Sequence, residues 1–136
     1  NINYLQLDTL PKFKDGWAPV LNTMTNGKYF STTGEVLIPN FGINGKGSGE
    51  SVKLNADGEA KIHLNIDWTF PLNFLEVVSG DGQTVFRERV DLSKTGAFGS
   101  EEFQLSLNLG NRTWARVEVW DIAANGAFTQ TIYFSK

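Results

Sequence analysis

Cysteine is absent from the 136 residues, and histidine occurs once, as His63. Without cysteine the chain has no disulfide, no thiolate metal ligand and no cysteine nucleophile. One histidine cannot supply the several imidazoles of a multi-histidine metal centre. These absences remove the key residue of most hydrolytic chemistries. We therefore expect a chain that is not an enzyme by itself and that holds no metal or other cofactor.

The chain also has little excess charge of either sign and no long apolar run. The 12 basic and 15 acidic residues leave a net charge of −3, which gives no electrostatic footprint for a polyphosphate backbone. No apolar run approaches the roughly 20 residues needed to cross a bilayer. We expect neither a nucleic-acid partner nor a membrane span.

Aromatic and turn-forming residues are plentiful, with 10 Phe, 4 Trp, 3 Tyr and 14 Gly. In residues 61–68 every second side chain is apolar, which predicts a half-buried strand and places Trp68 in the core. The same alternation recurs at residues 103–109. Further strands are predicted at residues 29–31, 36–38, 51–55, 74–79, 84–92, 114–121 and 128–134.

Turn dipeptides separate these strands. Asn44-Gly45, Asp57-Gly58, Asp81-Gly82 and Asn125-Gly126 accept the positive φ angles of a type I′ turn, which predicts at least three hairpins. Short strands at regular spacing, without helical crossovers, are typical of an antiparallel sandwich. We expect an immunoglobulin-like antiparallel β-sandwich of about seven to eight strands over residues 42–136.

A short helix is predicted over residues 15–26, ending at Asn26-Gly27. Pro19 is tolerated there only if it lies in the first turn. A helix and a short strand cannot bury an apolar face alone, so residues 1–41 must pack either on the sandwich or on another partner. The apolar residues at helical spacing are Trp17, Val20, Leu21 and Met24.

Groups with the chemistry for catalysis are dispersed. His63 lies on the polar side of its strand, which predicts a solvated surface histidine with no catalytic or metal-binding role. Carboxylate pairs such as Asp67 with Glu76, or Glu101 with Glu102, have no spacing that makes them converge. We therefore expect no catalytic residues.

Trp114 and Trp120 lie on the polar face of the strand predicted at residues 114–121, together with Arg116 and Glu118. Large aromatic side chains on a polar face indicate a partner surface. The alternative is that another part of the chain covers them, such as the helix through Trp17. Exposed tryptophans can also stack on sugar rings, which leaves a carbohydrate platform as a further interpretation.

Residues 17–38 read WAPVLNTMTNGKYFSTTGEVLI, residues 41–49 read FGINGKGSG, and the chain ends with WARVEVWD and AFTQTIYF at residues 114–121 and 127–134. In order and spacing these motifs resemble the region that follows the catalytic domain in bacterial PHP-type metallohydrolases of the CehA/McbA group. The resemblance covers about residues 15 to 136. The departure is Thr131, where the family pattern usually has proline.

The resemblance implies two parts. Residues 1–41 would be the last helix and strand of a metal-dependent α/β barrel, and residues 42–136 would be a C-terminal β-sandwich. The barrel's histidine and aspartate ligands lie upstream in that family, so none is expected here. The turn formed by Thr33, Gly34 and Glu35 would sit near the barrel and contribute to the rim of its active site.

We therefore expect a non-catalytic accessory domain that packs on and supports a PHP-like metal-dependent hydrolase domain of the same parent protein. The alternative is a carbohydrate-binding β-sandwich module that uses surface tryptophans. The strand composition and the frequent secretion of the family favour an extracytoplasmic location, periplasmic or secreted, over a cytoplasmic one. The side chains expected at the interface, or on the ligand platform, are Trp17, Leu21, Met24, Tyr29, Phe30, Trp114 and Trp120.

Overall fold

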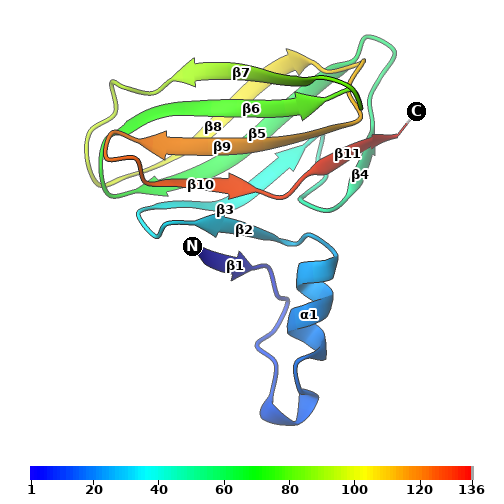
Figure 1. Cartoon of the computed structure of the whole chain (residues 1–136), viewed down its shortest axis with the longest axis vertical. Coiled ribbons are helices and arrows are strands. Elements are labelled where there is room, and N and C mark those ends of the chain that lie inside the picture. The colour runs from blue at the N-terminus through cyan, green and yellow to red at the C-terminus, as the bar shows by residue number, and fades with distance from the viewer. Residues whose placement is uncertain (136) are drawn as a thin grey trace.

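Two β-sheets pack face to face in the computed structural model, which describes residues 1–135 (Figure 1). The strands are β1 (Ile2–Leu5), β2 (Tyr29–Thr32), β3 (Val36–Ile43), β4 (Ser51–Lys53), β5 (Glu59–Trp68), β6 (Leu72–Gly80), β7 (Val85–Asp91), β8 (Gly99–Asn108), β9 (Trp114–Asp121), β10 (Gly126–Thr129) and β11 (Ile132–Ser135). A 3₁₀ turn (Phe13–Asp15) and the helix α1 (Ala18–Thr25) lie between β1 and β2. The predicted β-sandwich with a short helix is confirmed. The described residues form eleven strands, more than the predicted seven to eight.

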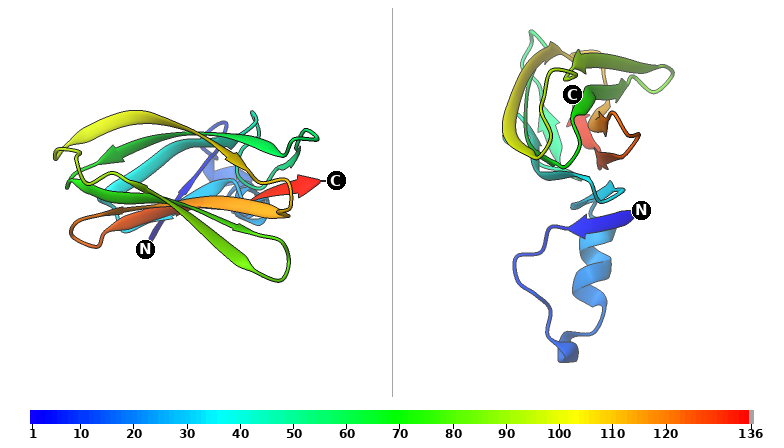
Figure 2. Two further views of the ribbon diagram at one scale, coloured as in Figure 1. Left: turned by 90° about the horizontal axis from the view of Figure 1, so that it is seen from above. Right: turned by 90° about the vertical axis from the view of Figure 1, so that its left-hand side faces the viewer.

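The small sheet has the order β3-β5-β8, and both of its pairings are antiparallel. In the large sheet β9 is central, with β6 on one side and β10 and β11 in succession on the other. β7 lies outside β6, while β2 and then β1 continue beyond β10. β4 pairs with β11 in parallel. Figure 2 shows the two layers from above.

Alternating side chains from both sheets fill the space between the layers. On β5, Ile62, Leu64 and Ile66 are at most 1% exposed. Burial of each such side chain stabilises the fold by roughly 1.5–3 kcal/mol. Trp68 is also buried, and its indole Nε1 donates to the carbonyl oxygen of Gly96 at 2.7 Å. The prediction that Trp68 belongs to the core is confirmed.

β3 runs across the boundary that we expected after Phe41. Val36 and Ile38 face the core, and after a bulge at Pro39 the inward positions shift to Phe41 and Ile43. Proline has no N–H to donate, and it is tolerated here because β3 is an edge strand. β2 pairs with β10 of the large sheet, and β3 pairs with β5 of the small sheet.

The four turn dipeptides have different outcomes. Asn44-Gly45 forms a turn with two left-handed residues, at φ 48° and 80°, but the strands that it connects, β3 and β4, lie in different sheets. Asp81-Gly82 and Asn125-Gly126 lie in the β6-β7 and β9-β10 hairpins. The hairpin predicted at Asp57-Gly58 is wrong, because this turn connects β4 of the large sheet to β5 of the small sheet.

The helix is shorter than the predicted residues 15–26, since it covers only Ala18–Thr25. Pro19 lies in its first turn, where no N–H is needed. Gly27 follows the helix with φ 68° and redirects the chain into β2. No residue of α1 is buried, and Figures 1 and 2 show the helix projecting away from the sandwich. We call residues 1–28 the N-terminal arm.

Candidate functional site

The N-terminal arm exposes large apolar side chains. Trp17, Leu21 and Met24 recur at helical spacing and are 76%, 57% and 37% exposed. Leu10 and Phe13 extend the apolar surface into the loop before the helix, and both are almost fully exposed. Clustered apolar side chains on a projecting element mark a surface that is suited to a partner.

A close backbone contact anchors the C-terminal end of α1. The carbonyl oxygen of Asn26 lies so near Gly49 that a Cβ atom at Gly49 would be only 1.8 Å away. The backbone N–H of Gly49 donates to the carbonyl oxygen of Thr131 at 2.8 Å, just before β11. The end of the helix is therefore held against the sandwich by a contact that only glycine permits.

Tyr29 and Phe30 lie at the base of the arm and are half-buried. Phe30 is paired with Tyr4 across β1 and β2, and the two rings stack with their centroids 5.1 Å apart and an interplanar angle of 7°. This stacked pair strengthens the attachment of β1 to the large sheet.

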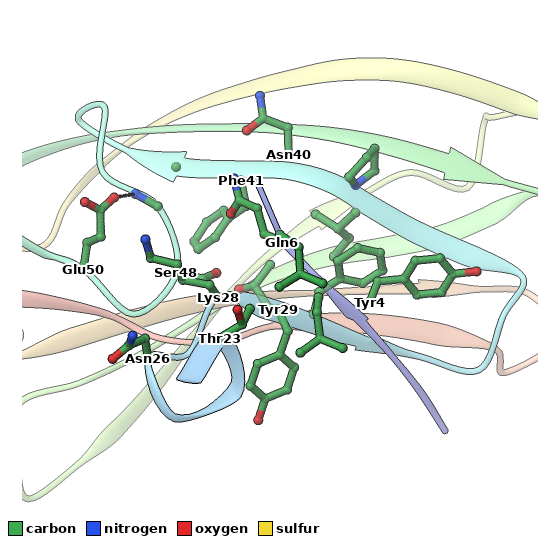
Figure 3. Close-up of a pocket in the computed structure, with 18 of the residues that line it drawn as sticks. Tyr4, Gln6, Thr23, Asn26, Lys28, Tyr29, Asn40, Phe41, Ser48 and Glu50 are labelled. Atoms are coloured by element: carbon green, nitrogen blue, oxygen red, sulfur yellow. Dashed lines mark hydrogen bonds between the residues drawn. The ribbon is translucent and has the colours of Figure 1, made fainter. Parts of the chain in front are cut away.

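An open groove of about 1070 Å³ lies between the arm and the edge of the small sheet (Figure 3). β1, α1 and β2 contribute one wall, while β3 and the loop at residues 45–50 contribute the other. His63 reaches the groove, and its Nε2 lies 3.1 Å from Glu102 Oε1. Hydrogen bonding from Gln104, and then the nearby imidazole, lowers the pKa of Glu102.

A second surface lies on the outer face of the large sheet, at the positions of β9 that point away from the core. Trp114 and Trp120 stand at the two ends of the strand, with Arg116 and Glu118 between them. All four side chains are half-buried. We define the β9 face as these four residues together with Glu76 of β6 and Arg87 and Arg89 of β7.

Each indole lies over a glycine of the neighbouring strand. A Cβ atom at Gly80 would be 2.6–2.8 Å from three ring atoms of Trp114, and one at Gly126 would be 2.6–2.7 Å from two ring atoms of Trp120. Gly80 and Gly126 are the cross-strand partners of these tryptophans. The missing side chains of the glycines therefore allow the rings to lie on the sheet, half-covered by their own neighbours.

An ion-pair network occupies the middle of the β9 face. Glu76 is 4% exposed, and its carboxylate accepts hydrogen bonds from Arg87 at 2.5 Å and from Arg89 at 3.0 and 3.2 Å. Arg116 donates to Glu118 at 2.5 Å. Glu76 and Glu118 are direct cross-strand partners, so their charges would repel each other without these arginines.

The arginines also determine the ionisation of Glu76. Burial opposes ionisation of this carboxyl, but hydrogen bonds and charge attraction from Arg87 and Arg89 outweigh burial and lower its pKa. The Arg89 guanidinium lies 3.8 Å from the ring centroid of Phe74, which positions it further.

The turn formed by Thr33, Gly34 and Glu35 connects β2 to β3. Thr33 makes two hydrogen bonds to the backbone of Gly126. Its N–H donates to the Gly126 carbonyl oxygen at 2.9 Å, and its side-chain Oγ1 accepts from the Gly126 N–H at 3.0 Å. The carbonyl oxygen of Glu35 accepts from Thr69 N–H at 3.0 Å. The turn is therefore firmly attached to the sandwich, at the opposite end of β2 from α1.

The seven side chains expected at one interface fall into two groups. Five are on the arm or at its base, and none of the seven is buried. Trp114 and Trp120 are on the β9 face, where each half-buried indole lies against a glycine of the neighbouring strand and Trp17 remains exposed. The structure therefore does not show the covering contact with Trp17. The five in the first group are Trp17, Leu21, Met24, Tyr29 and Phe30.

Sequence reasoning missed the ion-pair network. The carboxylate pair of Asp67 and Glu76 does not form, because the two residues lie on different sheets. Asp67 instead accepts a hydrogen bond from Ser100 at 2.5 Å. The alternation of Arg87 and Arg89 along one strand was the available signal for a charged face.

Residues 1–135 contain no group of three or more histidine, aspartate or glutamate side chains that could hold a metal ion. In the same part of the chain, no helix combines the length and the apolar character needed to cross a membrane.

Comparisons of the chain with protein-family models, with curated protein sequences and with solved structures find no match. The resemblance to PHP-type metallohydrolases therefore rests on the sequence motifs alone.

Proposed function

We propose that this chain is a non-catalytic accessory domain that packs on and supports a PHP-like metal-dependent hydrolase domain of the same parent protein. The observation that carries the proposal is the exposure of Leu21 and Met24 on a helix with no buried residue, together with that of Trp17 at its N-cap. A helix of eight residues is too short to be stable alone in water. A neighbouring domain would supply the missing contacts.

Burial of the arm against such a domain would be energetically substantial. Each large apolar side chain contributes roughly 1.5–3 kcal/mol when it is fully buried. Leu10 and Phe13 would add to the contact made by the helix. Two domains of one chain are held at high effective concentration, so most of this free energy is available to fix their arrangement.

The choice of a PHP-like partner rests on the motifs at residues 17–38, 41–49 and 114–134. The first motif contains both α1 and the turn at Thr33, Gly34 and Glu35. The helix and this turn flank β1 on the same edge of the large sheet, and Ile2 Cδ1 lies 3.8 Å from where a Cβ atom of residue 34 would be. One domain docked on this edge would contact both, which agrees with a place for the turn at the rim of an active site.

We also propose that the sandwich is immunoglobulin-like. The order β3-β5-β8 facing β7-β6-β9-β10 corresponds to strands A-B-E and C′-C-F-G of that arrangement, which supports the finer classification. For the parent protein we propose an extracytoplasmic location, on the strength of the family resemblance.

The first test is the coding sequence upstream of Asn1 in the parent gene. The proposal expects a domain of PHP type there, with its H-x-H and late D-x-H metal-ligand motifs. A signal peptide directly before Asn1 would instead make this a free-standing module and would contradict the proposal.

A second test uses limited proteolysis of the parent protein. Leu21→Asp places a charge in the proposed interface, so we expect faster cleavage around residues 26–28 than in the wild type. Ile122→Asp is the matched control, because Ile122 is also an exposed apolar residue, at 63%, but lies in the β9-β10 turn. Equal cleavage of both variants and the wild type would count against packing through the arm.

A further inference from the structure

We infer that the β9 face binds a neutral oligosaccharide that lies along β9 between Trp114 and Trp120. This surface is separate from the arm, so the inference does not depend on the proposed accessory role. It rests on two aromatic rings lying on the sheet at either end of a strand, and on a fixed set of hydrogen-bonding groups between them.

The two indoles form the ends of the site. Each ring has one side over a glycine, at Gly80 or Gly126, and each tryptophan remains partly exposed. Trp114 and Trp120 are six positions apart on one strand, which corresponds to about 20 Å at the usual rise per residue. A ring that lies along the surface can pack against the C–H face of a pyranose. The separation suits a ligand of several sugar units rather than a monosaccharide.

The groups between the indoles offer both donors and acceptors. Glu118 Oε1 is paired with Arg116 at 2.5 Å, while Oε2 has longer contacts, at 3.4 Å to Trp120 Nε1 and 3.8 Å to Arg87 Nη1. Glu118 Oε2 therefore retains the capacity to accept a hydroxyl hydrogen bond. Arg87 and Arg89 are more than half exposed and can donate from the other side of the face.

These polar groups are already held in place. Glu76 fixes Arg87 and Arg89, and Arg116 fixes Glu118, so few side chains would lose freedom when a ligand binds. Sugar hydroxyls both donate and accept, and they can replace the water that now solvates the outer edges of the network.

The charge balance favours a neutral ligand. Three arginines face two glutamates, and the ion pairs among them compensate most of the charge. The face carries only one more arginine than glutamate, in a chain of net charge −3, so it offers no concentrated positive charge for a polyanion. A flat protein partner would have to desolvate the guanidinium groups of Arg87 and Arg89, which are more than half exposed, and this is costly.

The test is calorimetric titration of the full chain with neutral hexasaccharides of glucose, xylose and mannose, after a screen on an array of neutral glycans. We expect binding that weakens roughly ten- to hundredfold in Trp120→Ala and in Trp114→Ala, as for other aromatic anchors. Trp120→Phe keeps an aromatic ring and should retain most of the affinity. Circular dichroism shows whether each variant is folded.

Phe98→Ala is the matched control, since Phe98 is an exposed aromatic residue, at 83%, in the loop before β8 of the other sheet. It should leave glycan binding unchanged, while the arm variant Leu21→Asp affects only the contact between domains. The inference is overturned if no neutral glycan binds, or if a folded Trp120→Ala variant binds as tightly as the wild type.

Discussion

On β5, Ile62, Leu64 and Ile66 are at most 1% exposed, whereas on the arm Trp17 and Leu21 are more than half exposed. Both regions are rich in apolar side chains, and they differ in what those side chains contact. In the sandwich a second sheet covers each apolar face, so the fold carries its own stability. On the arm, by contrast, α1 is anchored at its C-terminal end by the close contact with Gly49, and none of the residues of this helix is buried. The same residue types thus indicate a core in one region and an interface in the other.

The largest effect on stability is expected for a substitution in the core of the sandwich. Leu64→Ala leaves a cavity in the core and should lower the free energy of unfolding by about 2–5 kcal/mol. Urea denaturation of the wild type and the variant measures this difference. A loss below about 1 kcal/mol would mean that the space around Leu64 collapses easily and that the layers are not tightly packed.

The next largest effect on stability is expected when the contact between Gly49 and Asn26 is disrupted. Gly49→Ala introduces a Cβ atom 1.8 Å from the Asn26 carbonyl oxygen at a residue with φ 80°, so we expect the end of α1 to detach. Amide hydrogen exchange of α1 should accelerate, and the chain should be destabilised by about 1–3 kcal/mol.

Gly45→Ala is the control for Gly49→Ala. Gly45 also has φ 80°, but nothing lies within 4 Å of its Cβ position. Gly45→Ala should lower the free energy of unfolding by about 1 kcal/mol, because alanine disfavours a positive φ, without faster amide exchange in α1. Equal exchange in the two variants would show that the anchor does not hold the helix.

A smaller effect on stability is expected from the ion-pair network of the β9 face, and this effect depends on pH. The pKa of Glu76 lies below its ordinary 4.5 in the folded chain, so the folded state binds fewer protons than the unfolded state. The network therefore contributes stability above about pH 4.5, and this contribution is lost as the pH falls through the lowered pKa. Glu76→Gln should cost about 1 kcal/mol at pH 7, because the arginine partners are half-exposed.

Urea denaturation from pH 7 to pH 3 measures this dependence on pH. The difference between the wild type and Glu76→Gln should narrow toward pH 3. A constant difference over this range would mean that Glu76 acts through packing and not through its charge.

The smallest effect is expected for the isolated chain with Leu21→Ser. Since Leu21 is 57% exposed, the free energy of unfolding should change by less than about 0.5 kcal/mol. A loss of 2 kcal/mol or more, comparable to that of Leu64→Ala, would mean that the arm packs on the sandwich in solution. That result would remove the main support for an interdomain contact.

The sequence was sufficient for features that depend on local spacing. Alternation identified the β-sandwich and the buried Trp68, and helical spacing identified the region of α1. It also placed Trp114 and Trp120 on the outward side of their strand. These predictions succeed because a side chain's direction within a strand follows from its position alone.

Features that depend on register could not be predicted. The pairing of Glu76 with Glu118, and the position of Gly80 under Trp114, require the relative shift of β6 and β9. The strand β1 was missed because a segment of four residues is too short for a periodic signal. The turn at Asp57-Gly58 was misassigned because a local turn motif does not say which sheet the next strand joins.

The bulge at Pro39 has a consequence for association between chains. An edge strand with free N–H and C=O groups can add a strand from another molecule, and proline, bulges or charged side chains prevent this. β3 carries Pro39 at its bulge, β8 carries Glu101 and Glu102, and β7 is rich in charge. β1 consists of Ile-Asn-Tyr-Leu and has none of these protections. If its outer edge were left uncovered, self-association of the chain would therefore begin at β1, on the edge where we propose that a partner domain docks.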